Sequence, residues 1–248
     1  MVKGLDTFRK YFADYEEQYV LIGGAACDIL FESNEMSFRA TRDLDMVLIV
    51  EALTSEFGEK FWEFIVDGKY RNKATNGSNP QFYRFDKPED DKFPKMIELF
   101  CRSDFKLKNA NGITPIHIDD EVSSLSAILL NDDYYKALLN GKVIRNGLSV
   151  LRPEYIILFK VKAYLDLKMR KDLGEKVDSN DVKKHKKDIL RIASELLLEK
   201  VEELPIAVDA DIHSFIDLLE QEPFDQNSLK RYGLKNEDVV ELLKQVFG

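Results

Sequence analysis

The run of five apolar residues from Met46 to Val50 constrains the fold of this chain more than any other segment. It completes a strand-like stretch that begins at Asp43, and it lacks the alternation of apolar and polar residues typical of a strand with one wet face. Such a strand is buried on both faces of a sheet, so helices have to cover it. The segment from Ser55 to Val66 has the periodicity of one covering helix. The sequence therefore predicts an α/β fold for this part of the chain.

Strands and helices alternate through the rest of the first half. A strand from Tyr19 to Ile22 stops at Gly23-Gly24, and a helix follows from Ala25 to about Phe31. The other elements that we expect are a helix over Asp6 to Glu17, strands over Gln81 to Phe85 and Lys95 to Cys101, and a hairpin over residues 134–151 with turns at Asn140-Gly141 and Asn146-Gly147.

The periodicity changes at Pro153. From Glu154 onward the apolar residues recur at helical spacing, in several segments that extend nearly to the C-terminus. Asn236 precedes the last of these segments and is expected to be its N-cap. We therefore place a domain boundary near residue 152, with an α/β domain over residues 1–151 and a helical domain over residues 152–248.

The charge of the chain is unevenly distributed. Its 248 residues include 36 basic and 45 acidic side chains, which gives a net charge of −9. That charge repels nucleic acid on average, so a phosphate-rich partner has to meet a local basic surface. Residues 152–191 supply one, with 12 basic and 7 acidic residues, whereas residues 192–248 carry 5 basic and 13 acidic ones.

Several protein classes are excluded by composition. Hydrophobic residues make up 44% of the chain, and Gly and Pro are scarce, which excludes disordered and fibrous proteins. The first residues contain no apolar leader, and no apolar run approaches the roughly 20 residues of a membrane span. Cys27 and Cys101 have no Cys or His neighbour at metal-site spacing, which argues against a disulfide framework or a zinc site. We expect a cytoplasmic protein with no membrane partner.

Three acidic residues carry the clearest chemical signal. Asp43 and Asp45 are two positions apart in a strand, so both carboxylates project from one face at its start. Glu98 lies in a largely apolar strand, where a charge is costly unless it is paired or metal-bound. Mg²⁺ prefers carboxylate oxygens and substrate phosphates as ligands. The alternative for Asp43 and Asp45 is a pair of surface acids at a solvated strand end. The alternative for Glu98 is a position in an edge strand that has one face in water.

Other residues suit a phosphate group. Gly23-Gly24 would let a phosphate approach the backbone and the amides that start a helix, although the same pair is typical of a plain tight turn. Lys160 lies within an apolar helix and needs an anionic partner, such as a triphosphate, unless its side chain extends to the surface. The basic run over residues 183–187 fits a solvated helix face or an RNA-binding rim.

These motifs resemble the nucleotidyltransferase superfamily, which shares its fold with DNA polymerase beta, and in particular its AbiEii toxin-like branch. The matching segments are LIGGAACDIL, FRATRDLDMVLIV and MIELF. The glycine turn of the superfamily falls on Gly23 and Gly24, its two strand aspartates on Asp43 and Asp45, and its later acid on Glu98. The branch adds an Arg-x-Thr-x-Asp-x-Asp string that includes Arg39 and Thr41. Many relatives have a serine where this chain has Gly24.

The resemblance continues into the helical part and spans roughly residues 19–192. The branch has a Lys-x-x-Ala helix, matched by Lys160 and Ala163, and a later helix with an Asp before an apolar residue, matched by Asp188. The arginine of the branch is out of register here, and the nearest basic residues are Lys168 and Arg170. The resemblance implies a nucleotidyltransferase-type mixed sheet flanked by helices, followed by a helical domain.

We therefore expect a metal-dependent nucleotidyltransferase. It would use Mg²⁺ or Mn²⁺ and an NTP, with an RNA such as tRNA, a protein or a small molecule as acceptor. Asp43, Asp45 and Glu98 would be catalytic and hold the metal. The residues expected to bind the nucleotide are Gly23, Gly24, Arg39, Thr41, Lys160, Asp188, Lys168 and Arg170. The branch also implies a toxin-antitoxin or phage-defence setting with a cognate antitoxin. The alternatives are a non-catalytic scaffold that binds a nucleotide or partner, and a Mg²⁺-dependent phosphohydrolase or nuclease.

Overall fold

The computed structural model describes the whole chain except residues 1, 39–40, 42, 73–81, 101–127 and 129–130. Its helices and strands are, in chain order, α1 (Leu5–Tyr11), the short 3₁₀ helix η1 (Glu16–Gln18), β1 (Tyr19–Leu21), α2 (Gly23–Glu32), β2 (Asp43–Leu48), α3 (Ser55–Asp67), β3 (Arg71–Asn72), β4 (Phe82–Asp86), β5 (Met96–Phe100), α5 (Asp132–Gly141), β6 (Lys142–Arg145), β7 (Leu148–Leu151), α6 (Pro153–Asp172), α7 (Ser179–Glu195), α8 (Ile206–Gln221), α9 (Gln226–Tyr232) and α10 (Asn236–Phe247). Within these described ranges, no helix is both long and apolar enough to cross a membrane.

The chain divides into two compact units. The first consists of Met1–Ile118 and Lys142–Leu151, and the second of Asp119–Gly141 and Arg152–Gly248. Helix α5 precedes β6 and β7 in the sequence but belongs to the helical second unit. A boundary near residue 152 instead assigns α5 to the α/β domain.

The described strands of the first unit form one mixed sheet in the order β3-β4-β5-β2-β1-β7-β6. In its centre, β2 is parallel to β5 and antiparallel to β1, while β1 is parallel to β7. Antiparallel strands complete both edges. Leu44 and residues 46–48 of β2 are buried, as the apolar run predicts. The expected fold class, a mixed sheet flanked by helices with a helical part after it, is confirmed.

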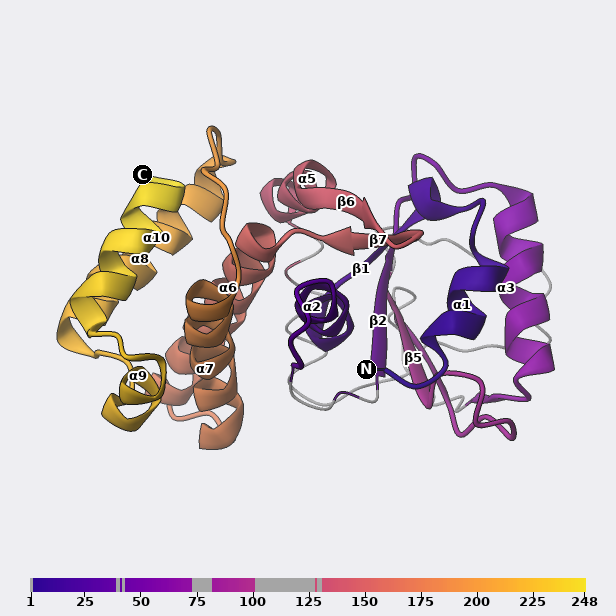
Figure 1. Ribbon diagram of the computed structural model, residues 1–248, viewed down its shortest axis with the longest axis horizontal. Coiled ribbons are helices and arrows are strands. Elements are labelled where there is room, and N and C mark those ends of the chain that lie inside the picture. The colour runs from indigo at the N-terminus through magenta and orange to yellow at the C-terminus, as the bar shows by residue number, and fades with distance from the viewer. Residues whose placement is uncertain (1, 39–40, 42, 73–81, 101–127, 129–130) are drawn as a thin grey trace. The chain divides into compact units, whose positions relative to one another are not determined.

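Helices cover both faces of this sheet. Helices α1 and α3 lie on one side and α2 on the other (Figure 1). Aromatic rings fill the side under α1 and α3, where Phe8 meets Tyr19 edge to face at 5.4 Å and Phe61 meets Phe85 at 5.5 Å. The α2 side bears the polar residues at the start of β2. The sheet therefore separates an aromatic core from the candidate site.

The second unit is built around α6. This helix packs against α5, α7 and α8, and α10 packs against α7 and α8. Every residue of α6 from 154 to 161 is buried, as expected of a helix with neighbours on all sides. The helical periodicity that begins at Pro153 is therefore that of a central helix and not of a surface one.

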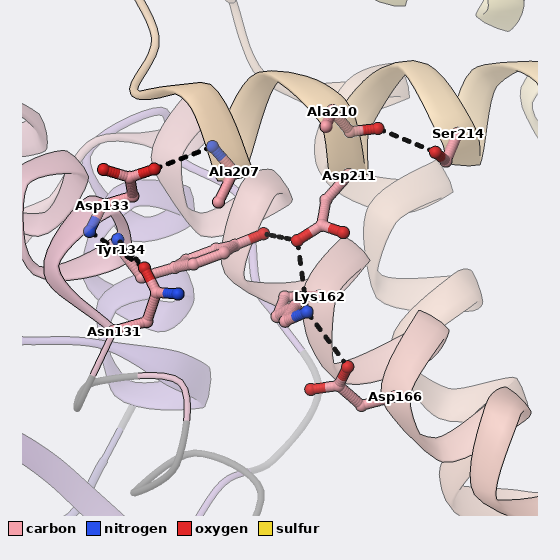
Figure 2. A network of polar contacts seen from close by, with 9 residues as sticks. All are labelled: Asn131, Asp133, Tyr134, Lys162, Asp166, Ala207, Ala210, Asp211 and Ser214. Atoms are coloured by element: carbon pink, nitrogen blue, oxygen red, sulfur yellow. Dashed lines mark hydrogen bonds and ion pairs between the residues drawn. The ribbon is translucent and has the colours of Figure 1, made fainter.

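A polar network joins α5, α6 and α8 (Figure 2). The buried Tyr134 hydroxyl donates to Oδ2 of Asp211 at 2.9 Å, and Nζ of Lys162 lies 3.3 Å from the same oxygen and 3.2 Å from Oδ1 of Asp166. Burial and the Asp211 carboxylate both raise the pKa of Tyr134, so its hydroxyl keeps the proton that it donates. Asp133 accepts a hydrogen bond from the backbone N–H of Ala207 at 2.8 Å, at the start of α8. The network fixes α5 to the second unit.

The hairpin expected over residues 134–151 is wrong in its first half. Residues 132–141 form α5, because Tyr134, Ala137 and Leu138 are buried at helical spacing and Asn131 accepts hydrogen bonds from the amides of the first turn. The hairpin is shorter and consists of β6 and β7. Its turn pair, Asn146-Gly147, is confirmed, with φ of 52° and 70° as a type I′ turn requires.

Two helix boundaries also differ from expectation. Helix α1 ends at Tyr11, because Phe12 leaves the helical path and packs its buried ring on Phe57. Asn236 is not the N-cap of α10. Its side chain accepts from the N–H of Phe224 and donates to the carbonyl of Leu219, both at 3.0 Å, while Lys235 takes the cap position. Contacts with residues distant in the sequence therefore determine where α1 ends and where α10 begins.

Replacing Tyr134 by Phe should lower the free energy of unfolding by about 1 kcal/mol, because the hydrogen bond to Asp211 is lost while the buried ring stays. Urea unfolding followed by circular dichroism measures the change. Ser214→Ala is the matched control, since it removes an exposed hydroxyl that bonds only within α8, and it should change stability by less than about 0.5 kcal/mol. Equal effects of the two substitutions would contradict the structural role of the network.

Candidate active site

The two aspartates of β2 lie beside Glu98. Asp43 and Asp45 occupy alternate positions at the start of the strand and are both half-buried. In the parallel pairing with β5, Asp45 is directly opposite Glu98. Residues directly opposite in a sheet point to the same face, so the three carboxylates share the α2 side. The sheet therefore places these three acids on one face of the first unit, in two neighbouring strands.

The start of α2 fits closely against these residues. Gly23 has φ of 61°, a conformation that favours glycine, and a methyl group on it would overlap Oδ2 of Asp45. A methyl group on Gly24 would lie 2.8 Å from Oγ1 of Thr41. Both positions therefore favour glycine because the side chains of Asp45 and Thr41 approach the backbone closely, in addition to the needs of a turn.

This helix start is suited to an anion. Among the described residues, no side chain caps α2, so the amides of its first turn keep their donors directed beyond the helix. The helix dipole adds a partial positive charge at the same place. Phosphate oxygens are bound in this way at helix N-termini. Gly23 and Gly24 therefore belong to the same site as Asp45 and Thr41.

Glu98 has a partner that the sequence analysis did not identify. Nε and Nη2 of Arg84 donate to Oε1 of Glu98 at 2.8 and 2.5 Å, from the strand next to it. The Glu98 side chain is only 8% exposed. Burial raises its pKa, against the effect of the Arg84 guanidinium. The charge of Asp43 raises it further, and a hydrogen bond with Asp45 lowers it.

Asp43 and Asp45 fit a divalent cation by their chemistry. Mg²⁺ in proteins is commonly held by one or two carboxylates together with substrate phosphates, and the start of α2 is the adjacent phosphate position. In the part of the chain that the structure describes, no three His, Cys, Asp or Glu side chains are grouped as a metal site. Glu98 as a third ligand therefore stays a prediction.

In the second unit, Lys160 and Asp188 bind each other. Nζ of Lys160 donates to Oδ2 of Asp188 at 2.7 Å, and the two side chains are 8% and 6% exposed. The anionic partner expected for Lys160 is thus a carboxylate of the same unit. A buried pair of this kind is neutral as a whole, which satisfies both charges without a ligand.

The other basic residues expected to bind nucleotide also have acidic partners. Lys168 donates to Glu222 at 2.9 Å, which raises the pKa of Lys168, and Nε of Arg170 donates to Glu175 at 2.7 Å. Lys186, within the basic run, donates to the backbone carbonyls of Glu222 and Pro223 and is half-buried. Glu222 and Glu175 therefore neutralise part of the basic stretch over residues 152–191.

The residues expected at the site are divided between the two units. Gly23, Gly24, Thr41, Asp43, Asp45 and Glu98 are together in the first unit, and Lys160, Asp188, Lys168 and Arg170 are in the second. Arg39 lies outside the described residues. Arg84 was missed, although an arginine between Tyr83 and Phe85 in a strand signals a nearby buried acid.

Comparisons with known proteins find a structural similarity. No family model matches the chain, and no curated protein matches it. Among solved structures, it is similar to the crystal structure of an antigenic nucleotidyltransferase-like protein from Paracoccidioides brasiliensis, with a TM-score of 0.47 and 14% sequence identity, over 99% of this chain and 95% of that chain. A likeness at this level carries no argument about activity, so we base the chemistry of the site on its own residues.

Gly23→Ala should destabilise the first unit by about 1–3 kcal/mol, because the added methyl group meets Asp45 at a positive φ. Gly58→Ala is the matched control. Gly58 lies within α3, nothing stands within 4 Å of its added methyl group, and alanine there should stabilise by about 0.5–1 kcal/mol. Urea unfolding of both variants measures the difference. A Gly23→Ala protein as stable as the unmodified one would disprove the close contact.

Lys160→Met or Asp188→Asn should each destabilise the second unit by about 3–5 kcal/mol, because each removes one member of a buried ion pair. The double variant Lys160→Met/Asp188→Leu should be more stable than either single variant, since it buries no charge. The comparison is made by thermal and urea unfolding. Glu89→Gln, in the exposed pair with Lys69, should leave the unfolding midpoint unchanged. Additive losses in the double variant would contradict the pairing.

Proposed function

We propose that this chain is a metal-dependent nucleotidyltransferase, which moves a nucleoside monophosphate from an NTP to a hydroxyl acceptor. The observation that supports this proposal is the contact between the glycine start of α2 and the β2 carboxylates. It combines an anion position and a cation position within one unit. A nucleoside triphosphate with its bound Mg²⁺ presents both charges together.

Each residue has a role in the proposed reaction. Asp43 and Asp45 hold Mg²⁺ or Mn²⁺, and the first amides of α2 with Thr41 donate to phosphate oxygens. The bound metal supplies the positive charge that neutralises the reacting phosphate oxygens. The acceptor oxygen forms a bond to the α-phosphorus, the bond from that phosphorus to the bridging oxygen breaks, and pyrophosphate leaves. Glu98 accepts the proton of the acceptor hydroxyl.

The basic residues of the second unit can bind phosphate only if they exchange their present acidic partners for it. If Lys160, Lys168 and Arg170 also bind phosphate, oxygen atoms of the nucleotide replace the carboxylates of Asp188, Glu222 and Glu175 as their acceptors. The proposal extends to the AbiEii toxin-like branch and to an antitoxin as partner. This extension rests on the sequence motifs.

The test uses the full chain with each of the four NTPs labelled at the α-phosphate, Mg²⁺ or Mn²⁺, and total RNA or cell extract. Label should move into RNA, protein or a small metabolite, and Asp43→Asn/Asp45→Asn should reduce the rate by about 100-fold or more. Glu59→Gln, which removes an exposed acid on α3, is the control and should keep full activity.

Other products would assign the other functions. Release of free nucleoside monophosphate without an acceptor indicates a phosphohydrolase, and shortened RNA indicates a nuclease. Binding of labelled NTP with no product in any fraction indicates a scaffold. Each of these results contradicts the transferase, since the acceptor hydroxyl then gains no nucleotide.

A further inference from the structure

Two Asn-Gly pairs of the same chemistry lie in different structural settings. The chain contains four such pairs, and those at residues 76–77 and 111–112 fall outside the described residues. The side-chain amide of an asparagine can be attacked by the backbone nitrogen of the next residue, and a glycine there hinders the attack least because it has no Cβ. Asn140-Gly141 and Asn146-Gly147 are equal in this respect, so only their surroundings distinguish them.

The pair Asn140-Gly141 forms the end of α5. Gly141 is buried, and a methyl group on it would overlap the ring of Tyr155. Its carbonyl accepts a hydrogen bond from the backbone N–H of Arg152 at 2.8 Å. Its own N–H is in the last turn of an α-helix, where such a group donates to the carbonyl four residues earlier. The Gly141 nitrogen is therefore engaged, and the peptide is fixed by contacts with α6.

The pair Asn146-Gly147 forms the tip of the hairpin between β6 and β7. Both residues are exposed, and β6 is an edge strand of the sheet. In a two-residue turn the hydrogen bonds belong to the flanking residues, here Arg145 and Leu148. Among the described residues, no backbone carbonyl outside the helices and strands accepts from the N–H of Gly147. The Gly147 nitrogen is therefore accessible.

The two asparagines also differ in what has to open before the attack. Asn146 has φ of 52°, a left-handed conformation that is less favourable for a residue other than glycine. It can leave this conformation when the last pair of the β6–β7 ladder opens. Asn140 cannot reach its glycine until the end of α5 unwinds and Gly141 separates from Tyr155. Local opening costs least at exposed turns, so Asn146 reaches the reactive geometry more often.

We propose that Asn146 is a site of spontaneous deamidation, and that α5 protects Asn140 from the same reaction. Water or hydroxide removes the proton of the Gly147 N–H. The nitrogen forms a bond to Cγ of Asn146, the bond from Cγ to Nδ2 breaks, and ammonia leaves with a proton from water. Water then opens the cyclic imide. Attack at Cγ gives aspartate, and attack at the backbone carbonyl carbon gives isoaspartate, in which the chain continues through the former side chain.

The two products affect the hairpin differently. Aspartate adopts the left-handed conformation as asparagine does, and Asp-Gly is a favoured pair in type I′ turns, so the aspartyl form keeps the turn. Isoaspartate adds a carbon atom to the backbone. The turn then no longer has the length that sets the register of β6 and β7, so the isoaspartyl form loses pairing at this edge of the sheet.

The experiment incubates the folded full chain at mildly alkaline pH and digests it with a protease that cleaves after lysine. Asn140 is then in the peptide 137–142 and Asn146 in the peptide 143–160, and mass spectrometry follows each separately. Asn146 should react at least about tenfold faster than Asn140, which corresponds to about 1.4 kcal/mol of additional opening free energy at α5. In the chain unfolded in urea, the two asparagines should react at similar rates.

A variant shows that the product comes from the turn. Asn146→Gly leaves a Gly-Gly pair, which suits the same type of turn, and it should abolish the modification of residues 143–160 without changing Asn140. An enzyme that methylates isoaspartyl carboxyl groups, supplied with a labelled methyl donor, identifies the isoaspartyl product in the unmodified sequence.

Two results overturn the proposal. One is an equal rate at Asn140 and Asn146 in the folded protein, and the other is an unchanged Asn146 after a time in which the unfolded chain has reacted. The inference is independent of the proposed transferase, because it requires neither a nucleotide nor a metal, and the transfer of label from an NTP is measured separately.

Discussion

Gly23 and Asp45 approach so closely that only a hydrogen atom fits on the α-carbon of Gly23 beside the carboxylate. The backbone N–H of Ile22, the residue before this glycine, also donates to the carbonyl of Asp45 at 3.0 Å. Together the two contacts join the end of β1, the start of α2 and the start of β2. The direction of the α2 amides follows from this junction, while the parallel pairing of β2 with β5 places Asp45 opposite Glu98.

Both units pair their buried charges. Lys160 and Asp188 form an ion pair in the helical unit. On the sheet, Arg84 pairs with Glu98, and Asp45 lies opposite Glu98 in the neighbouring strand. Burying ionised groups is costly unless they are paired, and perturbed ionisable groups gather at functional sites. A second acid beside a buried ion pair is therefore the feature that marks the candidate site.

Much of the first unit can be predicted from local sequence. The apolar run of β2, the glycines after β1 and the alternate aspartates each follow from a periodicity or a residue type, and the structure places them as expected. The pairing of Arg84 with Glu98 and that of Lys160 with Asp188 could not be predicted in this way, because each depends on a register or a helix contact between distant segments. The segment of α5 was mistaken for a strand because Asn140-Gly141 resembles a turn pair, while the contacts that stabilise it come from α8.

The place of α5 has a consequence for how the chain folds during synthesis. Tyr134 and its acceptor Asp211 are 77 residues apart, and the strands β6 and β7 of the other unit lie between them in the sequence. Since the N-terminal parts of a chain emerge first, the sheet can gain its last strands while α5 still lacks α6 and α8. The buried aromatic face of α5 is then exposed until most of the chain has left the ribosome. Premature termination before α8 would leave that face without its partner.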